Sequence, residues 1–373
     1  MKILKNWIKI LLINIGVVIL IFVLAEIGLR TYSTVKSCLT GQCDGQLFTR
    51  FNLFHENRLL GLTTHDPVLG YKPNPDFSGI IHHPPYWDNV HVSIDRHGFR
   101  RNVDDSNVNV PGHSGKKVLT VGDSFTFGDQ VHNSQTWPAC FANKTGHEVW
   151  NGGVGGYGAA QALLRAEQAI ANHGPFDTLI WSITVGSDFN RVRLKVRSNF
   201  SKPYIATVDG KPMIVPPGRF DPSPDFLWFL GYSVILQRHL LPILQERGNF
   251  EYDGRYEIPG ENAAEIEEIM DFSFQRFANL TGTKAKVVLL QYGPGILLEE
   301  GFERRDHERS LIRKYAEKYA IEIIDSFDQV YVPEKKEKLW FGYQLYSHHT
   351  PYGNKVVCDV VFHWHEKNRS DEL

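Results

Sequence analysis

The residues that could perform chemistry gather in three stretches of the chain. Ser124 stands in the stretch GDSFTFG, which directly follows the apolar run 118–121. A glycine-rich stretch, NGGVGGYG at 151–158, follows the next apolar run, and His348 and His349 stand together near the end of the chain. A serine nucleophile needs a base to take its proton and donors to bind the oxyanion, and glycine lets backbone approach closely. These residue types predict acyl transfer through a serine.

Plainer interpretations of these residues stay open. Gly122-Asp123-Ser124 is also the composition of an ordinary turn, and tandem histidines usually belong to exposed loops. The pair His82 and His83 lies beside prolines with no third ligand at metal-binding spacing, so we interpret it as an exposed loop. We expect neither a metal nor an organic cofactor.

An alternation of strands and helices begins at residue 116 and positions these stretches. The predicted strands are short apolar runs that end at Gly, Pro or polar residues: 117–121, 148–153, 177–186, 285–294 and 321–327. The predicted helices that accompany them are 159–174, 261–282 and 304–320. This order predicts a parallel sheet between two helix layers, with the working groups at the carboxyl ends of the strands.

The amino terminus has the composition of a membrane segment. Lys2, Lys5 and Lys9 precede the apolar run 10–25, which extends over 7–29 to a length that can cross a bilayer. No small-residue cleavage site follows the run, so we favour an uncleaved anchor over a cleaved signal peptide. Because lysines before such a segment stay in the cytoplasm, we expect the rest of the chain in the periplasm or at the cell surface.

The net charge indicates whether the protein binds nucleic acid, and the cysteine spacing indicates whether disulfide bonds can form. The net charge of −2 argues against a basic nucleic-acid surface. Cys38 and Cys43 follow the membrane segment at a spacing that could close a small loop in an oxidising compartment. We expect Cys140 and Cys358 to be separate buried thiols, the usual state of a lone cysteine.

From residue 116 to 365 the sequence resembles the SGNH (GDSL-type) hydrolase and acyltransferase superfamily. The stretch GDSFTFG carries the family's serine at Ser124, and NGGVGGYG matches the glycine block, with Gly156 at the oxyanion-hole glycine. The resemblance implies a flavodoxin-like three-layer α/β sandwich. It also implies that Asp123 is structural, with its side chain turned back to stabilise the turn.

The third block of the family departs from its usual form here. The family has Gly-x-Asn-Asp, whose asparagine donates a hydrogen bond to the oxyanion, where this chain has TVGSDFNR. Aligning Asp188 with the aspartate leaves Ser187 at the asparagine position, and Asn190 is the alternative donor. The resemblance therefore implies an oxyanion hole made by the backbone N–H groups of Ser124 and Gly156 with Ser187 or Asn190.

The fourth block lacks its acid. The family has an aspartate two or three residues before the histidine and a glycine five residues after it, so Gly353 selects His348 over His349. Leu345 and Tyr346 then occupy the aspartate positions. We expect a catalytic dyad of the serine and His348, with a backbone carbonyl to orient the imidazole. A degenerate member without activity remains the alternative.

The chain is expected to divide into a cytoplasmic tip and membrane anchor at 1–30, a β-rich lead-in at 31–115, an SGNH-like α/β domain at 116–365 with an insertion near 192–260, and a tail at 366–373. The expected function is a serine-dependent ester hydrolase that acts on small acyl esters or acylated glycans through an acyl-enzyme. The alternatives are an O-acyltransferase of a cell-surface polysaccharide and a non-catalytic binding protein on the same fold.

Overall fold

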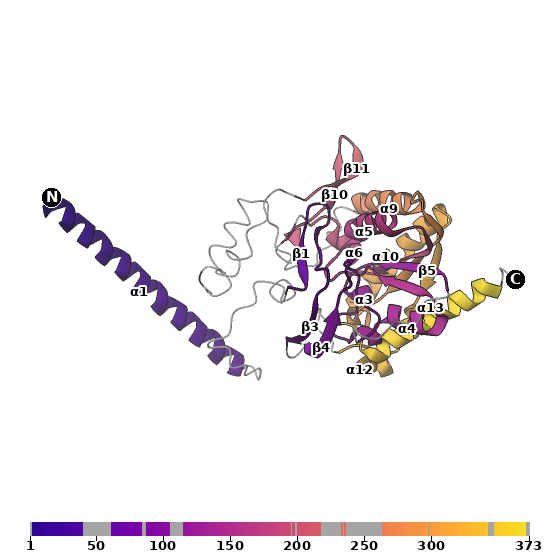
Figure 1. Cartoon of the computed structure of the whole chain (residues 1–373), viewed down its shortest axis with the longest axis horizontal. Coiled ribbons are helices and arrows are strands. Elements are labelled where there is room, and N and C mark those ends of the chain that lie inside the picture. The colour runs from indigo at the N-terminus through magenta and orange to yellow at the C-terminus, as the bar shows by residue number, and fades with distance from the viewer. Residues whose placement is uncertain are drawn as a thin grey trace. The chain divides into compact units, whose positions relative to one another are not determined.

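Figure 1 shows the computed structural model of the chain, which falls into two units. One unit comprises 1–59 and 220–252, and the other comprises 60–219 and 253–373. The structure describes residues 2–39, 61–83, 87–104, 115–194, 196–197, 200–217, 233, 235, 263–297, 299–341 and 347–370.

A five-stranded sheet lies at the centre of the second unit, in the order β13-β12-β7-β5-β6. All neighbouring strands pair in parallel. Taken in chain order these strands are arranged 2-1-3-4-5, the flavodoxin-like order, with its switch point between β5 and β7. The predicted fold class is confirmed. The strands are β5 Lys117–Val121, β6 Glu148–Asn151, β7 Phe176–Thr184, β12 Thr283–Gln291 and β13 Glu322–Asp325.

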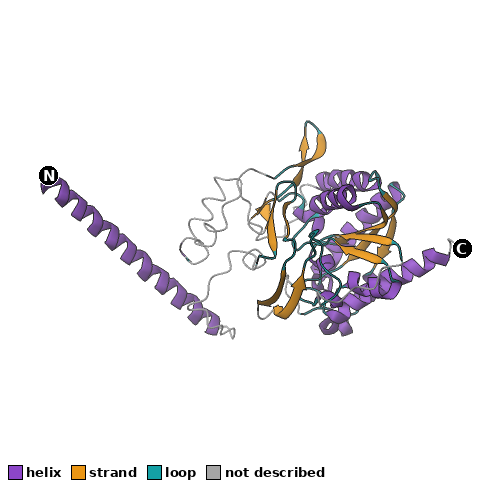
Figure 2. Ribbon diagram, in the orientation of Figure 1, coloured by secondary structure: helices purple, strands orange, loops and turns teal. Residues whose placement is uncertain are grey.

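Helices cover both faces of this sheet because successive strand residues point to opposite sides. Leu119 and Trp181 pack in the cluster that contains α5, α9 and α10, whereas Val118 and Ile180 pack with α4 and α13. Figure 2 shows these helices around the strands. The helices are α4 Trp137–Thr145, α5 Ala159–His173, α9 Ala263–Ala278, α10 Glu299–Lys318, α11 Phe327–Val330, α12 Lys336–Leu339 and α13 Pro351–Ser370, with 3-10 turns at Pro294–Leu297 and Pro333–Lys335.

The expected lead-in is divided between the units: residues 31–59 belong to the unit that holds α1, and residues from 60 onward belong to the unit of the sheet. The described residues of this second part form two antiparallel strand pairs. Its residue Arg100 forms a bridge with Asn151 at the end of β6, and Tyr71 donates a hydrogen bond to the Gly155 carbonyl. The lead-in therefore contacts the loops at the carboxyl edge of the sheet. Its strands are β1 Thr63–Asp66, β2 Gly70–Pro73, β3 Ser78–His83 and β4 Trp87–Ser93, and the insertion adds β8 Val196–Arg197, β9 Phe200–Ser201, β10 Tyr204–Val208 and β11 Lys211–Val215.

In the described part of the first unit, the residues Lys2–Leu39 form the long helix α1. Its segment Lys9–Tyr32 is long and apolar enough to cross a membrane, and the helix continues past the expected end of the anchor. The Glu26 carboxylate accepts hydrogen bonds from Ser233 Oγ at 3.0 Å and from the Ile235 amide at 3.1 Å. The insertion thus contributes residues to the unit that holds α1.

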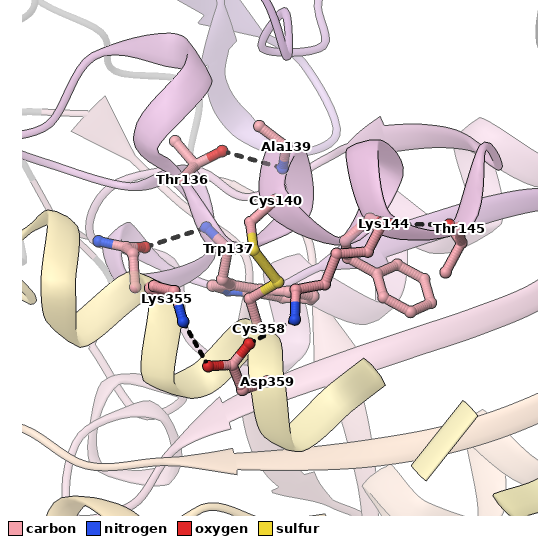
Figure 3. The surroundings of a disulfide bond; sticks show 11 residues. Thr136, Trp137, Ala139, Cys140, Lys144, Thr145, Lys355, Cys358 and Asp359 are labelled. Atoms are coloured by element: carbon pink, nitrogen blue, oxygen red, sulfur yellow. Dashed lines mark hydrogen bonds and ion pairs between the residues drawn. A yellow bond between two sulfur atoms is a disulfide. The ribbon is translucent and has the colours of Figure 1, made fainter. Parts of the chain in front are cut away.

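A disulfide links the two helices on one face of the sheet. The prediction that Cys140 and Cys358 are separate thiols is wrong, because they form a bond that joins α4 to α13 (Figure 3). The two cysteines are 218 residues apart in sequence, yet packing of both helices on the sheet brings their Cα atoms to 6.0 Å. Cys43 lies outside the described residues, so a bond to Cys38 stays a prediction.

The change Cys358→Ser is expected to lower the free energy of unfolding by about 2–4 kcal/mol, because the bond restricts the unfolded chain over a long loop. Urea unfolding of the whole protein in detergent measures this as a lower midpoint at unchanged slope. The matched variant Cys140→Ser should have the same effect, and the double variant should add little because both residues serve one bond. An unchanged midpoint in both single variants would contradict the bond.

Candidate active site

Ser124 lies just beyond the carboxyl end of β5. It is the first residue of the short helix α3 Ser124–Phe127, which only Gly122 and Asp123 separate from β5. Asp123 caps this helix by accepting a hydrogen bond from the Phe125 amide at 2.9 Å, and Gly128 ends it in the left-handed conformation at φ 87°. Asp123 is structural, as the resemblance implied, and the serine is held at the switch point of the sheet.

His348 contacts this serine from the far end of the chain. Its Nε2 lies 2.8 Å from Ser124 Oγ, and the side chain is part-buried beside the Phe125 ring. His349 points elsewhere and packs between Phe125 and Trp340. Of the two histidines, the structure therefore brings His348 to the serine.

The segment that carries His348 is tied to α4 just before α13 begins. The Asn354 side chain accepts from the Trp137 amide at 3.1 Å and donates to the His349 carbonyl. The disulfide joins the same two helices one turn further along. These contacts fix the segment that carries the histidine against the helix that follows the serine loop.

The side chain of Gln130 contacts Nδ1 of His348, where a backbone carbonyl was expected. Its Oε1 lies 3.2 Å from His348 Nδ1 and accepts a hydrogen bond from the His348 amide at 3.0 Å. The sequence did not predict this residue, because the family motif places an acid before the histidine, at the positions of Leu345 and Tyr346, which lie outside the described residues. Gln130 stands only six positions after Ser124, but its side chain reaches the imidazole through a left-handed backbone at φ 73°, which the sequence does not reveal.

Asp129 is a second buried polar residue next to the imidazole. Its Oδ2 lies 3.9 Å from His348 Nε2, and its Oδ1 has no hydrogen-bond partner among the described residues. Burial raises the pKa of Asp129 to about 7, although the charge of Arg100 acts in the opposite direction. The Asp129 carboxyl is therefore poised to change charge near neutral pH.

Burial also sets the charge of the histidine. It lowers the pKa of His348 to about 4, with the Asp123 carboxylate raising it and Arg191 lowering it by smaller amounts. The imidazole is consequently neutral at pH 7, which is the state that accepts a proton. Nδ1 faces Gln130 and Nε2 faces Ser124, so the neutral ring is oriented for proton transfer from the hydroxyl.

A buried ion-pair network supports the strand ends around the serine. Arg191 Nη1 donates to Asp123 Oδ2 at 2.8 Å and to Asp188 Oδ1 at 3.2 Å. Thr184 Oγ1 donates to the other Asp123 oxygen at 3.0 Å. Because these partners occupy the Asp123 carboxylate, it is not the acid that orients the histidine.

Apart from the Ser124 amide, the proposed oxyanion donors follow β6 and β7, the two neighbours of β5. Gly156 follows β6 and has φ 79°, and the preceding carbonyl is held by Tyr71 Oη at 2.9 Å. Since carbonyl and N–H of one trans peptide point in opposite directions, this contact orients the Gly156 N–H as well. Ser187 precedes the short helix α6 Asp188–Arg191 without a side-chain capping bond, and Asn190 donates to the Gly186 carbonyl at 2.9 Å. Their role as donors stays a prediction.

No family model matches the sequence, and no curated protein matches it. Several solved structures are similar in fold. An alpha/beta hydrolase from the metagenome of Lake Arreo, Spain, is 15% identical, with 66% of this chain and 93% of that chain covered and a TM-score of 0.37. A lipolytic protein of the G-D-S-L family from Veillonella parvula is 11% identical, with 66% and 96% covered and a TM-score of 0.38. An acetylxylan esterase from Geobacillus stearothermophilus is 14% identical, with 67% and 94% covered and a TM-score of 0.38.

Among the residues that the structure describes, no group of three or more His, Cys, Asp or Glu side chains is arranged to hold a metal ion.

Proposed function

We propose that the chain is a serine-dependent ester hydrolase that works through an acyl-enzyme. The observation that carries the proposal is the 2.8 Å contact between Ser124 Oγ and His348 Nε2, formed by a neutral imidazole whose other nitrogen faces Gln130. A hydroxyl and a base in hydrogen-bond contact, with the base oriented by a third group, is the arrangement that activates a serine for nucleophilic attack.

The reaction proceeds in two halves. Nε2 of His348 takes the proton of Ser124 as Oγ bonds to the ester carbonyl carbon, and the resulting oxyanion rests on the backbone N–H groups of Ser124 and Gly156. Ser187 or Asn190 supplies a further donor. The imidazolium then protonates the leaving alcohol as its bond to the carbonyl carbon breaks. Water attacks the acyl-enzyme with the same base, releasing the acid and restoring the serine.

The proposed substrates are small acyl esters or acylated glycans outside the cytoplasm. Two observations support that compartment. The disulfide between Cys140 and Cys358 is typical of oxidising compartments, and lysines precede the apolar helix, which orients such anchors with the following domain outside. We propose that α1 is a single-pass anchor and that the catalytic unit faces the periplasm or cell surface.

An O-acyltransferase of a cell-surface polysaccharide is the second candidate, and the apolar helix favours it because an anchor keeps the site near the envelope. The two functions share the acyl-enzyme and differ in whether water or a sugar hydroxyl attacks it. Adding soluble sugar acceptors to a hydrolysis assay separates them, since only a transferase releases the first product faster when an acceptor is present.

The whole protein in detergent should hydrolyse p-nitrophenyl acetate, with kcat/KM holding its plateau well below pH 6.5. The reason is that the base must be neutral, and burial lowers the pKa of His348 to about 4, so protonation removes the base only in more acidic solution. A pH profile of kcat/KM measures this. An acid limb at or above pH 6.5 that persists in Asp129→Asn would contradict the buried neutral base, because the Asp129 carboxyl, whose pKa burial raises to about 7, is then absent. No hydrolysis at any pH would favour the non-catalytic binding protein.

A further inference from the structure

We infer that Gln130 is the positioning residue that replaces the missing acid of the fourth block, holding His348 in the one tautomer that can deprotonate Ser124. The inference rests on the proposed function, which it deepens by assigning the third member of the site. No carboxylate takes this position in the described residues: Asp129 lies nearest Nε2, the other nitrogen of the ring.

The backbone of His348 determines which atom of the Gln130 amide faces the ring. The backbone N–H of His348 can only donate a hydrogen bond, and its partner at 3.0 Å is the side-chain amide of Gln130. The partner atom must therefore be the amide oxygen rather than the NH₂ group. This contact fixes the orientation of the amide without reference to the imidazole.

The tautomer of the histidine follows from that orientation. The same oxygen lies 3.2 Å from His348 Nδ1, and because an amide oxygen only accepts, Nδ1 must carry the hydrogen. Nε2 is then left with its lone pair toward the hydroxyl of Ser124 at 2.8 Å. An amide that turned its NH₂ group toward Nδ1 would favour the opposite tautomer and leave no base, and the backbone contact prevents this.

Contacts of the surrounding loop hold the Gln130 side chain against His348. Gln130 has φ 73°, a conformation that is costly for a residue with a side chain, and such residues persist where the surroundings fix them, often at active sites. The surroundings here include Arg100, whose guanidinium donates to backbone carbonyls on both sides of Asp129 and Gln130, at Gly128 and Val131, each at 2.6 Å.

A neutral amide orients the imidazole but gives the imidazolium no opposite charge. The charged or titratable groups around His348 are Asp129, Asp123, Arg191 and His349, and none of them contacts Nδ1 in the described structure. A carboxylate introduced at position 130 would therefore be the one charge in direct contact with Nδ1. Its effect on the pKa of the histidine distinguishes a contact with the catalytic ring from mere support of the loop.

The test compares Gln130→Glu and Gln130→Met with the native protein, using kcat/KM for p-nitrophenyl acetate against pH. Gln130→Glu should move the acid limb upward by about one pH unit or more, because an adjacent carboxylate favours the protonated imidazole. Gln130→Met keeps the side-chain length without the acceptor and should lower kcat about 10- to 100-fold with KM unchanged. Gln275→Glu makes the same change at an exposed position of α9, and it should alter neither kcat nor the acid limb.

A second measurement, by NMR, tests the role of Gln130 without relying on enzyme activity or on the folding of Gln130→Glu. Ring ¹⁵N shifts of His348, assigned by comparison with His348→Ala, report the tautomer directly. The native protein should show hydrogen on Nδ1, and Gln130→Met should lose that preference. Hydrogen on Nε2 in the native protein would overturn the role of Gln130, as would a folded Gln130→Glu with the native acid limb. A native protein with the Nδ1–H tautomer and no hydrolysis would overturn only the proposed function.

Discussion

Replacing Ser124 with alanine is expected to lower kcat for p-nitrophenyl acetate by about 10³-fold or more. The change removes the atom that forms the acyl-enzyme and leaves the oxyanion donors and the histidine in place. Since substrate binding is not altered, the loss should appear in kcat and not in KM. The initial rates of p-nitrophenol release by the two proteins, compared at equal protein concentration and over a range of substrate concentrations, measure the change in kcat and KM.

Two controls make this result specific to the site. Ser310 lies exposed on α10, so Ser310→Ala should keep the native rate. His348→Ala should be nearly as inactive as Ser124→Ala, and the double variant should lose little more, because the two residues act as one unit. A Ser124→Ala protein that retains more than about a tenth of the native kcat would contradict the proposed mechanism.

The second large effect is expected from Arg100→Met, which should lower the free energy of unfolding by about 3–5 kcal/mol and reduce activity. Arg100 is 2% exposed. Its guanidinium donates to the carbonyl oxygens of Phe127 at 2.8 Å and of Gly128 and Val131 at 2.6 Å, and to Asn133 Oδ1 at 3.1 Å. Methionine fills similar space but leaves these buried acceptors without their donor, and the loop that holds the catalytic groups loses its support.

The charge of Arg100 matters as well as its hydrogen bonds. Burial lowers the pKa of Arg100 to about 10, so the side chain is still charged at neutral pH. Its charge lowers the pKa of Asp129, and removing it should therefore keep the Asp129 carboxyl protonated to higher pH. The change should thus add an electrostatic effect on the neighbour of His348 to the loss of the loop contacts.

Urea unfolding of the whole protein tests the Arg100 prediction, with Arg96→Met as the matched control. Arg96 is exposed on the same segment of the lead-in, so its replacement should change stability by no more than about 0.5 kcal/mol. Equal unfolding midpoints for Arg100→Met and the native protein would show that the lead-in does not support the serine loop.

The fold could be predicted because its signals are local. All five strands of the central sheet were predicted, since each is a short apolar run that ends at polar residues or glycine. The disulfide could not be predicted in this way, because Cys140 and Cys358 meet only after α4 and α13 pack on one face of the sheet. Pairing across such a sequence separation depends on tertiary packing, which isolated cysteines do not encode.

In the active site, too, the residues within sequence motifs could be predicted, whereas those brought in by tertiary contacts could not. Ser124 could be placed from the strand that precedes it, and the spacing to Gly353 selected His348. Gln130 was missed because a glutamine carries no acid signature and because its contact depends on a left-handed backbone conformation. The contributions of Arg100 and Tyr71 were also missed, since only the folded lead-in brings these residues to the loops of the sheet.

The most direct test of the central claim is to treat the whole protein with a fluorophosphonate and to map the modified peptide by mass spectrometry. In this reaction Ser124 Oγ bonds to phosphorus, fluoride leaves, and His348 takes the proton. We predict a single adduct on the peptide that contains Ser124, absent in Ser124→Ala and much slower to form in His348→Ala. No adduct, or an adduct on another residue that survives in Ser124→Ala, would contradict the assignment of Ser124 as the nucleophile.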